Sequence, residues 1–234
     1  MAHNVQLIRT NTGWKSLFKI AGAAGLAMLG IMVAQIAVFI IWPPPVTVNG
    51  FFTLFQQSWL LGLLSLDLLY ILNNALLILI YLALYIALKR VTESGSLIAL
   101  VLGLVGISAY FASNPAFEML SLSGQYASAE NEVQRTVLLG AGESLLATYR
   151  GTAFDVYYVL NAAALLIFAV SMLRSDYFPR PAAVAGIVAG ILMIIPSTAG
   201  TIGLIFSLAS LVPWALFLIL IIPRLLRGAE IYSR

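Results

Sequence analysis

Long apolar runs separated by short polar segments organise the chain. The pattern predicts membrane-spanning helices, because about 20 apolar residues in a helix cross the roughly 30 Å hydrocarbon core of a bilayer. We expect six spans, at about residues 20–42, 60–88, 96–113, 152–173, 181–199 and 202–222. The expected fold class is therefore all-α, a polytopic membrane helix bundle that forms a single integral membrane domain over residues 1–234.

Residues 114–150 form the sizeable segment outside these predicted spans. Apolar residues recur in it every four positions, which is typical of an amphipathic helix: Val133, Val137, Ala141, Leu145 and Tyr149. Glu130 and Glu132 suit its first turn, where negative charge is favoured. We expect an external amphipathic helix that packs on the outer mouth of the bundle or lies on the membrane surface.

Proline and glycine mark the predicted span boundaries and contacts. Pro43–Pro45 follow the first apolar run, and Asn114-Pro115 closes the third. The segment from Pro196 to Gly203 reads as an outer turn between the last two spans. Gly186 and Gly190 match a small-xxx-small pattern, which predicts a close contact between helices.

The second predicted span carries polar residues that a bilayer disfavours. At 100° per residue, one stripe of roughly 60° holds five polar-capable side chains: Asp67, Tyr70, Asn74, Tyr81 and Tyr85. A carboxylate inside a membrane should face the bundle interior or water. Two hypotheses follow. The stripe either holds helices together through hydrogen bonds or forms a ligand or ion site.

The composition excludes several classes of protein. The chain is 62% hydrophobic and 9% charged, against about 25% charged residues in soluble domains, so a soluble globular domain is excluded. The absence of Cys excludes disulfides, thiolate nucleophiles and iron–sulfur ligation. The single histidine, His3, stands at the start of the chain, so a haem-ligating or catalytic histidine inside the membrane is excluded. No cofactor, metal site or nucleic-acid partner is expected.

The basic residues predict the orientation in the membrane. With six spans, ten of them fall on one side: Arg9, Lys15, Lys19, Lys89, Arg90, Arg174, Arg180, Arg224, Arg227 and Arg234. Arg135 and Arg150 fall on the other side. The positive-inside rule then places both termini in the cytoplasm. The inner surface should attract anionic lipid headgroups, and the acidic outer side should attract cations or a basic partner.

Counting from these basic residues at 1.5 Å per residue places polar side chains of three spans at a similar depth. Asn74 and Asn161 lie about 20–22 Å above the inner boundary, and Gln35 about 24 Å. Asp67 and Asp155 lie about 28–33 Å above it. The predicted ligand-binding residues, all near the outer half of the membrane, are Asp67, Tyr70, Asn74, Asp155, Tyr158 and Asn161.

Four stretches resemble a large bacterial family of membrane proteins, catalogued as domain of unknown function 4386. They are Tyr110–Ser123, Gly151–Tyr158, Gly200–Gly203 and Leu211–Trp214, and the resemblance extends over the chain from about Trp59 onward. It implies a six-span protein of the bacterial inner membrane and supplies no activity or catalytic residue.

Three hypotheses of function follow. The first is a non-enzymatic membrane protein whose outward-facing acidic cavity binds a small solute, cation or lipid headgroup. The second is a structural or accessory subunit of a larger membrane complex or homo-oligomer. The third, a remote alternative, is an intramembrane aspartyl enzyme that uses Asp67 and Asp155, although neither aspartate stands in a Gly-x-Gly-Asp setting.

Overall fold

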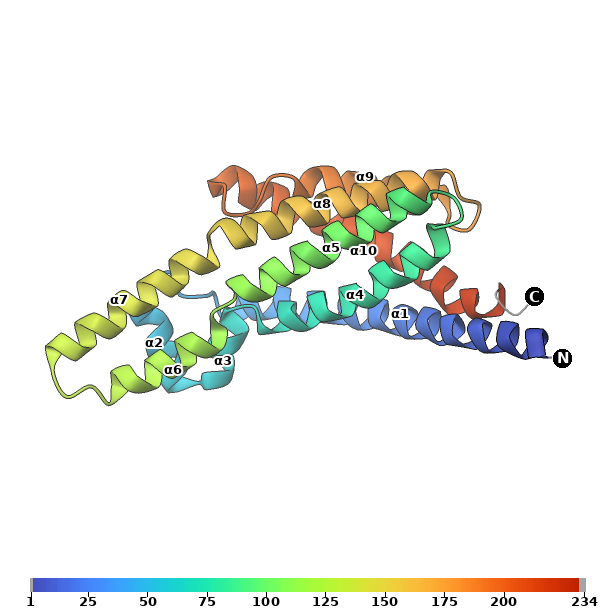
Figure 1. Ribbon diagram of the computed structural model, residues 1–234. Helices are drawn as coiled ribbons and strands as arrows, with labels where there is room; N and C mark the ends of the chain where they lie inside the picture. Colours follow the sequence, from blue (N-terminus) through green and yellow to red (C-terminus); the bar gives the residue numbers. More distant parts are fainter. Residues whose placement is uncertain (1, 232–234) are drawn as a thin grey trace. The chain divides into compact units, whose positions relative to one another are not determined.

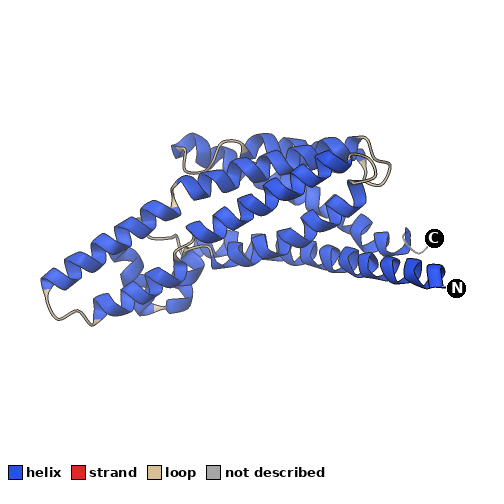
Figure 2. Cartoon of the chain, in the orientation of Figure 1, coloured by secondary structure: helices blue, strands red, loops and turns tan. Residues whose placement is uncertain are grey.

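The computed structural model describes the backbone of residues 2–231 and the side chains of residues 14–227. Throughout this described part the regular secondary structure is helical, without a strand (Figure 2). The helices are α1 (Ala2–Ile41), α2 (Val48–Gln57), α3 (Trp59–Ser65), α4 (Leu68–Leu88), α5 (Glu93–Ser113), α6 (Ala116–Ala127), α7 (Glu132–Tyr149), α8 (Thr152–Leu173), α9 (Arg180–Met193) and α10 (Gly200–Ile231). The all-α prediction is confirmed. The side chains of His3, Arg9, Glu230 and Arg234 lie outside the described residues.

Five helical segments of the described residues are long and apolar enough to cross a membrane. They are Trp14–Ile41, Leu68–Leu88, Glu93–Ala127, Glu132–Leu173 and Gly200–Arg227. The protein is therefore a membrane-embedded helical bundle. Within the predicted span 181–199, the helix α9 ends at Met193 and a turn follows it, so the sixth span stays a prediction. The 14 residues of α9 rise about 21 Å, less than the bilayer core.

The second predicted span, 60–88, is not one helix. The chain forms the short helix α3, leaves helical geometry at Leu66 and Asp67, and restarts as α4. The 21 residues of α4 rise about 31 Å, which matches the bilayer core. A single helix over the whole stretch would have exceeded it. The break also corrects the predicted stripe, because Asp67 does not lie on the helix that carries Tyr70, Asn74, Tyr81 and Tyr85.

The described residues fall into two compact units, and the boundary between them cuts α1, α4, α5 and α8. Unit 1 draws on Met1–Gly30, Asn74–Ile107 and Tyr158–Arg234, and unit 2 on Ile31–Asn73 and Ser108–Tyr157. The single membrane domain expected from the sequence stays a prediction.

The core of unit 1 is built from apolar faces of its helices, with Phe18, Tyr81, Phe168 and Phe217 among the fully buried side chains. In this unit α9 and α10 run side by side (Figure 1). A Cβ added at Gly190 would lie 2.8 Å from the Leu166 side chain of α8. The predicted close helix contact at the glycine pair of α9 is thus confirmed.

The core of unit 2 is aromatic at its centre. Phe51, Phe52 and Phe55, on one face of α2, are buried against α3, α6 and α7. The helices α6 and α7 form an antiparallel pair with α2 beside them (Figure 1). The helix predicted from the apolar residues between 133 and 149 is therefore present as α7. The same segment also contains a second helix, α6, that the four-residue pattern did not indicate.

The buried face of α7 differs from the predicted one. Val133 and Val137 are 74% and 66% exposed, whereas Gly142 and Leu146 are buried. The buried positions are four residues apart in the C-terminal half of α7, where Gly142 faces Val48 and Phe52 of α2. Val133 and Val137 lie in the first two turns of α7, before these buried positions.

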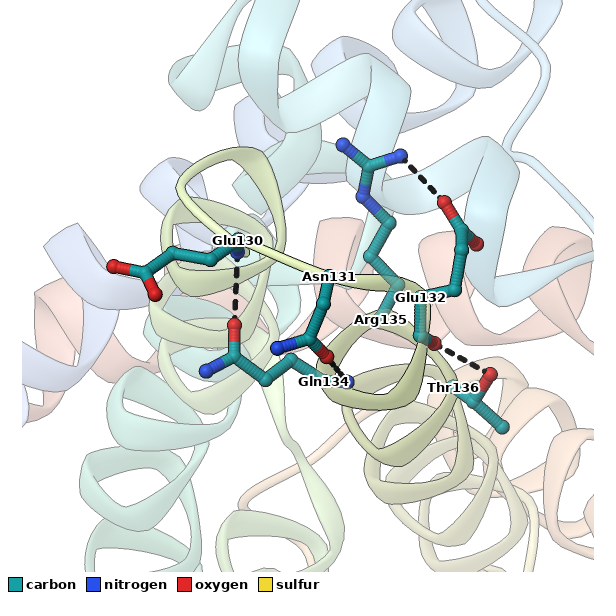
Figure 3. Close-up of polar contacts among 6 residues, drawn as sticks. All are labelled: Glu130, Asn131, Glu132, Gln134, Arg135 and Thr136. Carbon is teal, nitrogen blue, oxygen red and sulfur yellow. Dashed lines mark hydrogen bonds and ion pairs between the residues drawn. The ribbon is translucent and has the colours of Figure 1, made fainter.

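Local hydrogen bonds explain where α7 begins. Asn131 is its N-cap, and the Asn131 Oδ1 accepts a 2.9 Å hydrogen bond from the Gln134 backbone N–H (Figure 3). The Gln134 side chain in turn accepts one from the Glu130 N–H at 2.8 Å. Such reciprocal bonds satisfy the free N–H groups of a helix start. Of the two glutamates predicted for the first turn, Glu132 lies there and pairs with Arg135, whereas Glu130 precedes the N-cap.

Candidate functional site: the Asp67 cluster

Asp67 has an unusual backbone conformation in unit 2. It is the one non-glycine residue of the described part with a positive φ, at 62°. Aspartate and asparagine tolerate this left-handed region better than other side chains. The Ile71 N–H donates to the Asp67 carbonyl at 3.0 Å, which starts the hydrogen bonding of α4. The residue type therefore suits the break between α3 and α4.

Side-chain amides from two other segments stabilise this break. The Asn114 Nδ2 donates to the Leu66 carbonyl at 2.8 Å, and the Gln35 Nε2 donates to the Leu64 carbonyl at 3.3 Å. The last carbonyls of a helix have no intrahelical partner and need such donors when they are buried. These two hydrogen bonds therefore stabilise the end of α3 at Leu66.

The Asp67 side chain is 8% exposed and accepts a short hydrogen bond from the Tyr149 hydroxyl. The ion pair found among the described residues joins Arg135 to Glu132, so Asp67 has no basic partner there. Asp67 precedes the apolar segment Leu68–Leu88. Burial raises its pKa from 3.8 to about 6, and the Tyr149 hydrogen bond opposes that shift.

Several tyrosines lie in the region of this carboxylate. Tyr110 lies near Asp67 and near three further tyrosines, Tyr70, Tyr149 and Tyr157. The Tyr110 and Tyr157 ring centroids lie 4.8 Å apart, and Phe154 contacts the rings of Tyr110, Tyr149 and Tyr157. We refer to Asp67 with Tyr70, Tyr110, Tyr149 and Tyr157 as the Asp67 cluster.

Two buried hydroxyls belong to the same region. The Tyr110 hydroxyl and the Ser65 Oγ, two residues before Asp67, have no hydrogen-bond partner in the described structure. Most buried polar atoms in proteins are hydrogen-bonded. The region therefore contains the Asp67 carboxylate and two hydroxyl oxygens, of Ser65 and Tyr110, that form no hydrogen bond in the described structure.

Unit 2 as a whole is acidic. Its ranges hold six acids and two bases, a net charge of −4, while those of unit 1 hold ten bases and three acids, a net charge of +7. Every charge assigned from the sequence to the outer side lies in unit 2, and every charge assigned to the inner side lies in unit 1. The Asp67 cluster thus belongs to the acidic unit.

The residues predicted to share one site divide between the units. Asp67, Tyr70 and Asp155 belong to unit 2, and Asn74, Tyr158 and Asn161 belong to unit 1. Asn74 is fully buried, whereas Asp155 is half-buried at the start of α8. The Tyr158 hydroxyl is hydrogen-bonded to the Ser207 Oγ of α10 at 2.8 Å. The predicted pairing of Asp67 with Asp155 stays a prediction.

Sequence reasoning missed five members of the region: Ser65, Tyr110, Asn114, Tyr149 and Tyr157. Tyr149 was assigned to the apolar face of an external helix, and its hydroxyl was not considered. The signal available was the excessive length of the 60–88 run, which required a break. Asp67 is one of the residues in that run that tolerate a positive φ, together with Gly62, Asn73 and Asn74. No group of three metal-ligating side chains occurs among the described residues.

Comparison with known families agrees with the resemblance found in the sequence. The family model described as Domain of unknown function (DUF4386) matches residues 23–226. The chain belongs to this family. The DUF4386 match also includes most of the first predicted span, which the resemblance from Trp59 onward left out. Neither the curated proteins nor the solved structures contain a match to the chain.

Proposed function

We propose that this DUF4386 protein is a non-enzymatic membrane protein that binds a small monovalent cation at the Asp67 cluster. The observation that carries the proposal is a buried carboxylate without a basic partner among the described residues. A buried charge needs a counter-ion, a proton or extensive hydrogen bonding. A bound cation would supply the missing positive charge at neutral pH.

The surroundings of Asp67 favour a cation over a neutral solute. The Tyr110 and Ser65 hydroxyls have no hydrogen-bond partner in the described structure and would offer oxygen ligands to an alkali ion, and tyrosine rings in general attract an ammonium group by cation–π interaction. The net charge of −4 in unit 2 raises the local concentration of either cation.

Thermal unfolding of the full chain in detergent tests the proposal. Sodium, potassium and tetramethylammonium chloride are compared at equal ionic strength and pH 7.5, with Tris chloride as the reference. We expect at least one cation to raise the unfolding temperature, because a ligand that binds the folded state stabilises it. Asp67→Asn should abolish the shift while it keeps a hydrogen-bond acceptor for Tyr149 and a residue suited to positive φ.

Glu118→Gln, which removes an exposed carboxylate of unit 2, is the matched control and should retain the shift. An equal shift in the Asp67→Asn variant would refute the cation site. The accessory-subunit hypothesis replaces the cation-site proposal if no cation changes the unfolding temperature of any variant and the protein co-purifies with other subunits at a fixed ratio.

We further propose that α9 and the turn after it complete a sixth span, with both termini in the cytoplasm of a bacterium and the protein in its inner membrane. The ten-to-two distribution of basic residues supports this orientation. Under this proposal α6 and α7 are external, and the Asp67 cluster lies on the outer side of the membrane.

A further inference from the structure

Unit 1 contains an apolar groove between α9 and α10. Its volume is about 760 Å³, within the range of small-molecule sites. The apolar side chains that line it include Val184, Val188, Leu192, Ala209, Pro213 and Leu216. At one end, where α9 begins, the groove is lined by Arg180.

The groove follows from the packing of α9. Its glycine face, at Gly186 and Gly190, packs on α8 and Phe217. The valine face, at Val184 and Val188, is left 53% and 43% exposed toward the groove. Each face repeats every four residues, so the same short helix presents a packed side and an open side.

Pro213 shapes the opposite wall. Proline has no backbone N–H, so it cannot donate to the carbonyl of Ala209 four residues earlier, and its ring crowds that carbonyl. Ala209 and Pro213 both line the groove. The helix α10 continues through Pro213 without one of its backbone hydrogen bonds, and this position forms part of the groove wall.

The dimensions of the groove indicate its occupant. Arg180 and Leu192 are twelve residues apart on α9, which corresponds to about 18 Å along the helix. One leaflet of the roughly 30 Å hydrocarbon core is about 15 Å thick. The groove thus has the length of one acyl chain, and its lining is apolar throughout apart from Arg180.

The positive charge of Arg180 indicates that a lipid bound in the groove has an anionic headgroup. Its side chain is exposed and takes no part in an ion pair within the described residues. A guanidinium binds phosphate oxygens in a bidentate manner. We propose that the groove binds one acyl chain of an anionic phospholipid whose phosphate contacts Arg180. This inference does not depend on the Asp67 cluster.

Native mass spectrometry of the detergent-purified full chain tests the proposal. Dioleoyl phosphatidylglycerol, dioleoyl phosphatidylcholine and oleic acid are added separately at equal concentration. We expect phosphatidylglycerol to be retained most strongly. Arg180→Ala should reduce its retention about fivefold, the effect of one basic residue on an anionic lipid, and Val188→Trp should reduce it by filling the groove.

Arg174→Ala is the matched control, because Arg174 is exposed in the loop before α9 but does not line the groove. It should leave retention unchanged. Equal losses in Arg174→Ala and Arg180→Ala would show unspecific surface attraction and overturn the proposal. Stronger retention of oleic acid, or equal retention of phosphatidylcholine, would overturn the phospholipid assignment. The unfolding temperature of each variant confirms that it is folded.

Discussion

The Tyr81 hydroxyl donates a 2.8 Å hydrogen bond to the Asn161 Oδ1 in the interior of unit 1. Both side chains are buried, and the bond joins α4 to α8. Two glycines of α5 make room for the pair, since Gly103 faces the Tyr81 ring and Gly106 faces the Asn161 amide. This part of the predicted polar stripe holds helices together.

Gly103→Ala should destabilise the protein. A Cβ at this position would overlap the Tyr81 ring, and such overpacking costs about 1–3 kcal/mol. Thermal unfolding in detergent measures the effect. Gly124→Ala in α6, where no atom lies within 4 Å of the added Cβ, is the control. Equal unfolding temperatures for the two variants would contradict the close packing at Gly103.

Tyr81→Phe should lower stability by about 0.6 kcal/mol, the average for an interhelical hydrogen bond in a membrane protein. The loss should not add to that of Asn161→Leu, because both changes remove the same bond. Unfolding of the two single variants and the double variant in detergent gives the coupling. Additive losses would show that the hydroxyl and the amide do not interact energetically.

Asp67 should make stability depend on pH. Its pKa is about 6 in the folded protein, against 3.8 for an ordinary aspartate exposed to water, so the folded state holds the proton more tightly. Stability should therefore fall as pH rises from about 4 to 7, by roughly 3 kcal/mol. Asp67→Asn should remove this dependence and be more stable than the native chain at pH 7 without added cation. Unfolding scans across the pH range measure both effects. Parallel curves of stability against pH for the native chain and Asp67→Asn would contradict the raised pKa of Asp67.

The proposed orientation predicts external labelling at residue 128. Ser128 is exposed between α6 and α7, and the chain contains no natural cysteine. A membrane-impermeant maleimide should label Ser128→Cys in intact cells. Labelling that requires the reagent to reach the cytoplasm would reverse the proposed orientation.

Much of the fold could be predicted from the sequence, because apolar length and proline positions determine where membrane helices run. The predicted fourth span coincides with α8 at both ends, and Asn114-Pro115 marks the end of α5. The break at Asp67 could not be read from periodicity, because a helical wheel assumes an unbroken helix. The contacts of Asp67 with Tyr149 and of Tyr81 with Asn161 join residues about 80 positions apart, and a periodic pattern carries no information about such pairs.

The distance along the chain between Tyr81 and Asn161 also bears on biosynthesis. Tyr81 leaves the ribosome 80 residues before its partner, and at translation rates of about 5–20 residues per second this interval is roughly 4–16 s. During that time the hydroxyl lies in a helix that has entered the membrane without α8. The hydrogen bond between α4 and α8 can therefore form only after α8 has been made, so it belongs to a late step in the assembly of unit 1.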